Sequence, residues 1–324
     1  MATLPVFTET IDNAFVETWY DIKAQAVDNI LDALVVWNVL RNRGVLKTQV
    51  GSDMITETIK YGRAATPKWI KKGSLLTSGE QETETMAIWN WKYSSTHVQR
   101  DIIDDQKNAG QYKIKSYIAK RLKEAREEIE QNFESLLDGA WTSGEANDDK
   151  MMGLNHLLPG SSDKATGTFG GINRSETWWQ ANYKTATAVA EVNLVSDMRN
   201  LFNTVHNNQI PPDLLITTQT IYEIYEDFGL DAIQISGDKR LLDLGFETLK
   251  FKGQDMIWTP NTTSGTIKML NTDFISIYYD PKLWFDMTKF KDTANSTARI
   301  AHIISALQMT GTQPRRHGLL ESIS

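Results

Sequence analysis

The side chains that could carry catalytic or metal chemistry are few in this sequence and lie far apart. The five histidines are His97, His156, His206, His302 and His317. None of them lies in an H-E-x-x-H motif or at another spacing typical of metal ligands. His302 falls within a strand pattern, where we expect a structural histidine rather than a ligand. The sequence therefore predicts no metal site.

Two pairs of adjacent carboxylates, Asp104-Asp105 and Asp148-Asp149, have the chemistry for Mg²⁺ binding or acid–base catalysis. Adjacent acids on polar turns are usually solvated, and we favour that interpretation. The motif G-x-S-x-G does not occur, and the glycine-rich stretch 139–175 matches neither phosphate-binding motif. Because the chain has no cysteine, thiolate catalysis and disulfides are excluded. We expect a protein that is not an enzyme and holds no cofactor.

The composition is that of an ordinary soluble globular chain. It has 324 residues, of which 40% are hydrophobic and 23% charged, enough for a large core, and we expect two domains. The net charge of −7 argues against a general nucleic-acid binder. The N-terminus lacks the pattern of a signal peptide, and no stretch approaches the roughly 20 apolar residues of a membrane span.

Residues 108–139 show the strongest periodic pattern. Apolar residues recur at steps of three and four, which indicates one face of a helix roughly 42 Å long. The other face is basic in its first half and acidic in its second, an order that opposes the helix dipole. Two interpretations stay open: a surface helix packed on a sheet, or a spine whose charged side meets other subunits. The apolar positions are Ile114, Ile118, Leu122, Ala125, Ile129, Phe133 and Leu136.

An extended arm and another helix precede this region. Residues 1–10 lack periodicity, and a helical pattern then runs from Phe15 to Leu40. Gly44 lies where a helix C-terminus favours glycine. This helix either packs on the core of its own chain or docks on a neighbour. Its apolar positions are Phe15, Trp19, Ile22, Ala26, Ile30, Leu34, Trp37 and Leu40.

Residues 45–87 have no strong helix or strand core, which is uncommon inside a compact domain and indicates a functional extension or disorder. Two short strands that form a projecting hairpin fit this stretch. Its middle is basic around Trp69, and its return leg is acidic. The loop is either solvated or meets an acidic surface elsewhere. Trp89, Trp91 and Tyr93 then alternate with polar residues, which predicts a strand with one aromatic face.

The second half mixes helices and strands without a βαβ repeat, so the predicted class is α+β. Asn193 is a plausible cap for a helix that contains Leu194, Met198, Leu201, Phe202 and Val205. The remaining predicted elements are a strand at 214–216, a helix at 218–228, a hairpin at 246–258, and strands at 269–279 and 298–309.

The order of these parts resembles the major capsid proteins of tailed phages, which have the Hong Kong 97-type fold. The resemblance covers nearly the whole chain. The segments that carry it are Gly171-Ile172-Asn173-Arg174-Ser175 followed by Trp178-Trp179, Pro212-Asp213-Leu214-Leu215-Ile216, Phe251-Lys252-Gly253, Leu270-Asn271-Thr272 and Gln313-Pro314-Arg315-Arg316-His317-Gly318.

The resemblance implies a division into five parts. They are an N-terminal arm and helix (1–44), an extended E-loop (45–87), a P-domain strand, spine helix and following loop (88–185), a mainly A-domain segment (186–295), and a C-terminal strand and tail that return to the P-domain (296–324).

The resemblance also implies a function. Such a protein self-assembles through hexamers and pentamers into the icosahedral head shell that encloses double-stranded DNA, without sequence-specific DNA binding. It implies assembly in the host bacterial cytoplasm, a virion location, a portal, a possible decoration protein, and a separate scaffold protein or none. Alternatives are an encapsulin-like nanocompartment shell, a tail or connector protein, and an enzyme of unknown class.

We predict a subunit contact in which the basic part of the loop lies over the acidic half of a neighbour's spine helix. Trp69 would anchor it, because aromatic residues are frequent hot spots. Lysine–asparagine cross-linking, known in the family, is not expected here, because no partner asparagine can be matched. The predicted contact residues are Pro67, Lys68, Trp69, Lys71, Lys72, Glu127, Glu128, Glu130 and Glu134.

Overall fold

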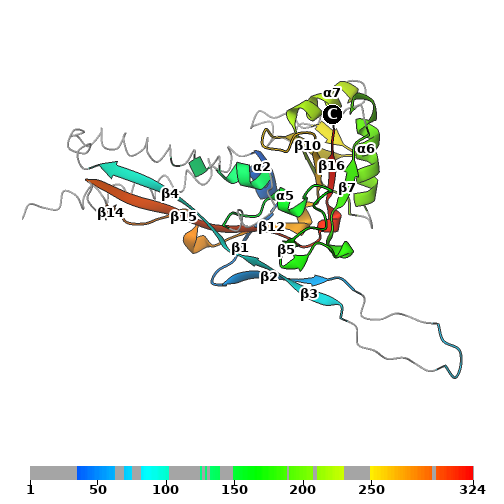
Figure 1. Cartoon of the computed structure of the whole chain (residues 1–324), viewed down its shortest axis with the longest axis horizontal. Helices are drawn as coiled ribbons and strands as arrows, with labels where there is room; N and C mark the ends of the chain where they lie inside the picture. Colours follow the sequence, from blue (N-terminus) through cyan, green and yellow to red (C-terminus); the bar gives the residue numbers. More distant parts are fainter. Residues whose placement is uncertain are drawn as a thin grey trace, which may run out of the picture.

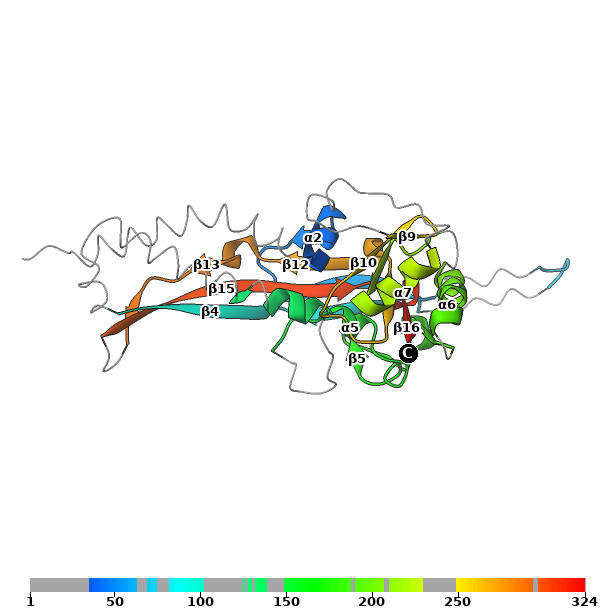
Figure 2. The same cartoon turned by 90° about the horizontal axis from the view of Figure 1, so that it is seen from above.

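The structure is a computed structural model. It describes residues 35–62, 69–74, 82–101, 125, 128–129, 132–138, 149–187, 190–206, 210–229, 249–293 and 297–323. Figures 1 and 2 show an elongated molecule, with a long β-ribbon towards one end and a more compact body of helices and strands towards the other. The predicted α+β class is confirmed.

The long sheet is built around β15 (Ala298–Gly311), which confirms the strand predicted at 298–309. β15 pairs antiparallel with β4 (Lys92–Asp101) along most of its length. At its other end it pairs with β12, and β12 pairs in parallel with β1. β1 therefore belongs to this sheet, although residues 45–87 are predicted to form the E-loop. The proposed division of the chain into five parts stays a prediction. The smaller strands of this sheet are β1 (Leu46–Thr48), β12 (Ile275–Tyr279), β13 (Asp286–Met287) and β14 (Lys291–Asp292).

The sheet of the body has the strand order β7-β16-β11-β8-β10-β9. β8 (Leu214–Thr217) is buried at every position, which confirms the buried strand predicted there. α6 (Ala190–Val205) and α7 (Gln219–Gly229) lie against this sheet (Figure 1). The other strands are β7 (Asn182–Thr185), β9 (Leu249–Phe251), β10 (Gln254–Trp258), β11 (Ile267–Leu270) and β16 (Gly318–Glu321).

The apolar face predicted for α6 is confirmed, but its predicted start is wrong. Asn193 lies within the helix rather than at its N-cap. The chain that enters α6 is instead held by the carboxylate of Asp197, which accepts hydrogen bonds from the backbone N–H (2.6 Å) and the hydroxyl (3.2 Å) of Thr187. The buried side chains of the helix are Leu194, Met198, Leu201, Phe202 and Val205, as predicted.

The strand predicted at 269–279 is wrong as a single element. Its two halves, β11 and β12, lie in different sheets and are separated by a 3₁₀ turn, η4 (Thr272–Phe274). The side-chain oxygen of Asn271 accepts a hydrogen bond from the N–H of Asp273 (3.2 Å). The N–H of Asn271 donates to Nδ1 of the buried His317 (3.2 Å). Local side-chain hydrogen bonds thus compete with the strand and turn the chain from one sheet to the other.

α2 (Val35–Asn42) confirms the predicted C-terminal end of the first helix. Gly44 has φ +74° and donates its N–H to the carbonyl of Arg41 (2.9 Å). The N–H of Val45 donates to the carbonyl of Leu40 (3.2 Å). Together these bonds form a Schellman cap, which requires the left-handed conformation that glycine adopts without strain. The earlier part of the predicted helix lies outside the described residues.

The residues described between 125 and 138 are helical and belong to the predicted central helix. Ala125, Ile129 and Phe133 are buried, as predicted. The ring of Phe133 stacks on Trp37 at 5.6 Å between centroids and on Trp284 at 6.4 Å. The central helix, α2 and the loop that precedes β13 therefore share one aromatic core.

The aromatic strand is present but does not have one aromatic face. It is divided at Trp91 into β3 (Glu84–Asn90) and β4. Trp89 is 1% exposed, whereas Tyr93 is 62% exposed. Trp91 donates its indole N–H to the carbonyl of Ser52 (2.7 Å), so it is turned towards the neighbouring strand connection instead of continuing the alternation.

The remaining elements are short. β9 and β10 form the predicted hairpin, with Lys252 (φ 50°) and Gly253 (φ 84°) in its turn. In the described part of the stretch 139–175, loops predominate as expected. Among the described residues, no helix is both long enough and apolar enough to cross a membrane. The other elements are α5 (Leu154–Leu157), β5 (Thr168–Phe169), β6 (Ile172–Asn173), η2 (Thr177–Trp179), η5 (Pro281–Leu283) and η6 (Pro314–Arg316).

Candidate assembly surfaces

The predicted projecting hairpin is formed by β2 (Met54–Lys60) and β3, which pair antiparallel and extend away from the body (Figure 1). Its side chains alternate between two faces. Ile55 and Trp89, which lie opposite each other, are buried. On the other face, Met86 is 56% exposed and Ile88 is 40% exposed. A two-stranded hairpin with an uncovered apolar face has little independent stability in water, so that face is a candidate for burial against another chain.

The base of the hairpin is held firmly by aromatic side chains. The ring of Trp89 packs edge-on against Phe169 with 6.0 Å between centroids. Gly170 has φ +59°, and a Cβ at this position would lie 2.7 Å from Trp89 Cζ2, so only glycine fits there. At the loop end of β2, Tyr61 stacks on Trp178 at 5.0 Å. These contacts fix where the hairpin leaves the body.

The described part of the loop tip carries the predicted anchor and basic residues on its surface. Trp69 is fully exposed and Ile70 is 59% exposed. Lys71 and Lys72 are also exposed. A turn holds this segment, because Ser74 donates its N–H to the carbonyl of Lys71 (3.0 Å). The tip therefore offers apolar and cationic groups together. The predicted contact residues Pro67 and Lys68 lie outside the described residues.

The acidic half of the central helix is only partly available to a neighbour. Glu128 is exposed, and its Oε2 accepts a hydrogen bond from the hydroxyl of Thr96 (3.1 Å). Glu134 is 8% exposed and faces the interior of its own chain. Because that carboxylate cannot be reached from outside, Glu134 does not belong in the contact predicted from sequence. Glu127 and Glu130 lie outside the described residues.

Glu134 instead forms part of a polar junction between the central helix and the body. Its Oε1 accepts a hydrogen bond from Thr259 (3.3 Å), and its buried Oε2 has no partner among the described residues. Burial raises the pKa of Glu134 to about 7. One turn further on, the buried Asp138 pairs with Lys268 and accepts a hydrogen bond from Thr262. No local pattern in the sequence predicts this junction, because the partners lie more than a hundred residues apart in the chain.

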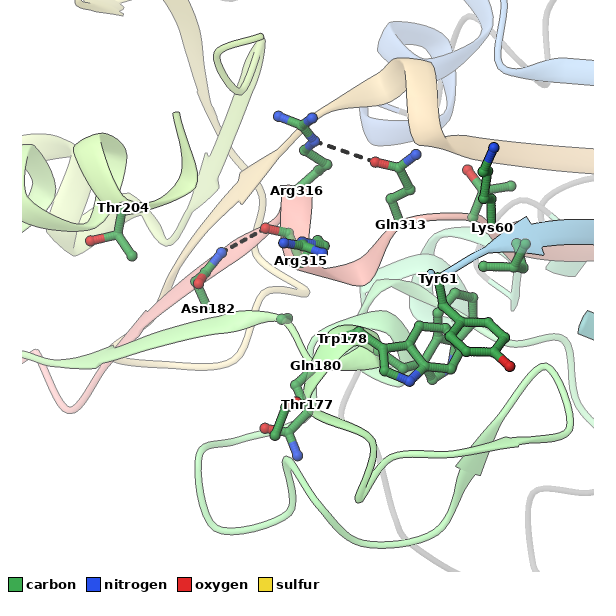
Figure 3. A pocket seen from close by; sticks show the side chains of 14 residues that line it. Lys60, Tyr61, Thr177, Trp178, Gln180, Asn182, Thr204, Gln313, Arg315 and Arg316 are labelled. Atoms are coloured by element: carbon green, nitrogen blue, oxygen red, sulfur yellow. Dashed lines mark hydrogen bonds between the residues drawn. The ribbon is translucent and has the colours of Figure 1, made fainter. Parts of the chain in front are cut away.

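A cavity of about 580 Å³ lies beside the loop end of β2 (Figure 3). Its wall includes the Tyr61–Trp178 stack and three cationic residues, Lys60, Arg315 and Arg316, and none of the described residues that line it is a carboxylate. Arg316 donates its Nε–H to the side chain of Gln313 (3.3 Å). Such a wall attracts anionic groups. Sequence reasoning missed this cavity, because its cations come from segments that are distant in the chain.

The histidines take several structural roles. Burial lowers the pKa of His317 to about 3, and burial with the nearby Arg174 lowers that of His156 to about 4. His302, expected to be a satisfied structural residue, is exposed instead, opposite the exposed His97 of β4. Within the described residues, no group of three or more histidines and carboxylates is arranged to hold a metal ion.

The paired carboxylates do not form a site in the described part of the chain. Asp149 is exposed, whereas Asp104, Asp105 and Asp148 lie outside the described residues.

Comparison of the sequence with known protein families and with curated proteins finds no match. The structure does match solved capsids. The capsid asymmetric unit of Cyanophage A-1(L) aligns with a TM-score of 0.64 and 15% identity, covering 87% of this chain and 90% of that one. The capsid of a native GTA particle gives 0.59 and 10%, covering 88% and 90%. The mature capsid of bacteriophage PhiM1 gives 0.53 and 8%, covering 86% of each chain.

The fold is therefore that of a viral capsid protein. More narrowly, it is the Hong Kong 97-type fold of tailed-phage major capsid proteins, as the resemblance implied. At these sequence identities the likeness establishes the architecture alone. In this chain that architecture combines the long ribbon, the central helix, the projecting hairpin and the α+β body.

Proposed function

We propose that this chain is a major capsid protein that self-assembles into the icosahedral head shell of a tailed phage, around its double-stranded DNA genome. The observation that carries the proposal is a hairpin whose apolar outer face is uncovered, on a chain with a capsid fold. The described residues leave Met86 and Ile88 on that face, and Trp69 at the tip, uncovered. Other copies of the same chain would provide their burial.

The assembly follows from ordinary interface physics. Permanent assemblies bury on the order of 2,000 Å² or more per interface. A hairpin that docks on the next copy makes a heterologous contact, and such contacts close into rings when the rotation allows it. We propose hexamers and pentamers as those rings. The protein would have a structural rather than an enzymatic role, and no sequence-specific contact with the packaged DNA.

The partners and place of assembly follow the same proposal. The shell would assemble in the host bacterial cytoplasm and remain in the virion. It would join a portal and use a separate scaffold protein, with a decoration protein as a further candidate partner. The net charge of −7 fits a container into which DNA is pumped, because tight binding of DNA to the wall would oppose its movement.

We further propose that the basic tip of the hairpin, with Pro67 and Trp69, lies over Glu127, Glu128 and Glu130 of a neighbour's central helix. Exposed ion pairs contribute only about 0.2–1 kcal/mol each, so they would set register more than hold the shell. Replacing Lys68, Lys71 and Lys72 by glutamate should lower the assembly yield at low salt. A yield equal to wild type at every salt concentration would contradict this contact. A matched control with the same change of charge elsewhere is the triple variant Lys150→Glu, Lys282→Glu and Lys289→Glu.

The test of the function is electron microscopy of the expressed chain, alone and with a candidate scaffold. Closed icosahedral shells that contain DNA, or can be filled with it, support the proposal. Closed shells with a co-purified enzyme would instead indicate an encapsulin-like nanocompartment. Rings or tubes would indicate a tail or connector protein. A stable monomer with catalytic turnover would overturn the proposal in favour of an enzyme.

A further inference from the structure

We propose that His97 and His302 form a surface site for a transition-metal dication of the Cu²⁺, Ni²⁺ or Zn²⁺ type, with water as the remaining ligands. The two residues are direct partners in the antiparallel pairing of β4 with β15. Directly opposed residues of an antiparallel pair point to the same face of the sheet. Both side chains are exposed on that face. The inference concerns the subunit itself and does not depend on shell assembly.

The backbone hydrogen bonds show which kind of pair this is. The N–H of His302 donates to the hydroxyl of Thr288 (2.9 Å), and its carbonyl accepts from the N–H of Thr288 (2.8 Å). Both backbone groups of His302 therefore point away from β4. His97 and His302 form a non-hydrogen-bonded pair, the class in which opposed side chains approach more closely, with Cβ atoms about 4.5–5.5 Å apart.

This separation suits chelation by two imidazoles. Metal–nitrogen bonds of this class are about 2.0–2.1 Å long, so one ion can join two side chains that start from neighbouring Cβ atoms. In the described part of the chain, neither imidazole makes a hydrogen bond, ion pair or ring contact that binding would have to break. Imidazole nitrogen is a preferred ligand for Cu²⁺, Ni²⁺ and Zn²⁺, whereas Mg²⁺ and Ca²⁺ prefer oxygen.

The surroundings are mixed in charge. From the strands on the far side of β15, Asp286 lies opposite Ile304 and Lys291 lies opposite Ile300. Each is therefore a diagonal neighbour of His302, about 7–8 Å away and farther from it than the directly opposed His97. With one carboxylate and one ammonium group flanking the pair, the two imidazoles remain the only ligands that the described residues supply.

The other three histidines provide internal controls. His317 is fully buried, and Nδ1 of His156 and of His317 already accepts a hydrogen bond from a backbone N–H. His206 is exposed but stacks on Phe202 at 6.1 Å between centroids, with no second histidine opposite it. Metal binding by the folded chain should therefore depend on His97 and His302 together and be indifferent to His206.

The experiment is titration of the full chain with Cu²⁺, Ni²⁺, Zn²⁺ and Mg²⁺ by calorimetry, together with electron paramagnetic resonance of the Cu²⁺ complex. We expect one site per chain, with Cu²⁺ bound most tightly and Mg²⁺ not bound. The Cu²⁺ spectrum should show coupling to two imidazole nitrogens. Binding should weaken in acid, because a protonated imidazole cannot be a ligand.

Replacing either histidine by alanine should lower the Cu²⁺ affinity by at least about tenfold. Even the loss of a group that only hydrogen-bonds to a metal ligand costs that much at many metal sites. His206→Ala should leave the affinity unchanged. Because both histidines are exposed, the variants should melt like wild type without metal, which separates loss of binding from loss of folding. Wild-type affinity in His97→Ala or His302→Ala, or a spectrum with one nitrogen ligand, would overturn the proposal.

Discussion

Replacing Glu134 by glutamine should stabilise the protein above pH 7 and have little effect in acid. The side chain is 8% exposed, and one of its carboxylate oxygens is buried without a partner in the described part of the chain. Burial therefore disfavours the charged form and raises the pKa from 4.5 to about 7. Glutamine has the same shape and keeps an oxygen that accepts the hydrogen bond from Thr259, but it carries no charge.

The magnitude follows from proton linkage. Between pH 4.5 and 7 the folded chain binds more protons at Glu134 than the unfolded chain does. The contribution of Glu134 to stability is therefore greatest below pH 4.5 and is lost as the pH rises towards 7. Each unit of pKa corresponds to about 1.36 kcal/mol, so the buried charge costs roughly 3 kcal/mol above pH 7. Glu134→Gln should regain that amount at pH 8 and less than about 1 kcal/mol at pH 5.

The assay is urea unfolding of unassembled subunits, followed by tryptophan fluorescence at pH 5 and pH 8. Glu128→Gln is the matched control, because this glutamate lies on the same helix but is exposed. The control should change the free energy of unfolding by less than about 0.5 kcal/mol at both pH values. If Glu134→Gln gave the same change at pH 5 and pH 8, the carboxylate would not be buried in the way described.

Three further substitutions test other parts of the fold by the same unfolding measurement. Burial lowers the pKa of His317 in the folded chain to about 3, so the contribution of this residue to stability is lost as the pH falls from 6.5 towards 3. His317→Gln should therefore make the loss of stability in acid shallower. An unchanged dependence of stability on pH in acid would contradict this. Gly170→Ala should cost about 1–3 kcal/mol, because its Cβ would meet the ring of Trp89, and a neutral result would mean that the hairpin base yields easily. Lys268→Met should cost about 3–5 kcal/mol by leaving Asp138 buried without its cation; a cost below 1 kcal/mol would show that water reaches this junction.

Elements whose signals are local could be predicted from the sequence. The alternation of apolar residues at steps of three and four gave the buried face of α6, and the Lys252-Gly253 turn marked the β9–β10 hairpin. Gly44 marked the end of α2, because the left-handed position is a property of a few adjacent residues. In each case the pattern that predicts the element also stabilises it.

Features that depend on distant segments could not be predicted in this way. Glu134 belongs to a run of acids on the polar side of a helical pattern, and only the loop around Thr259 turns that position into the interior. In the same helix Leu136 is half-buried and Leu137 is fully buried, so the body covers a slightly different face than periodicity indicates. The exposure of Trp69, Lys71 and Lys72 agrees with the sequence, but their contact with a neighbour stays a prediction.

The hairpin combines a rigid base with an uncovered outer face, and both properties bear on assembly. Association of proteins costs translational, rotational and conformational freedom, and the conformational part is smaller for a segment already held in its bound direction. The Trp89 packing under Gly170 and the Tyr61–Trp178 stack supply that direction within the single chain. Met86 and Ile88 are exposed in the single chain, so their burial against another copy would add to the free energy of association. A hairpin that was flexible along its whole length would lose part of that gain in becoming ordered, so the aromatic base should favour assembly without touching the neighbour.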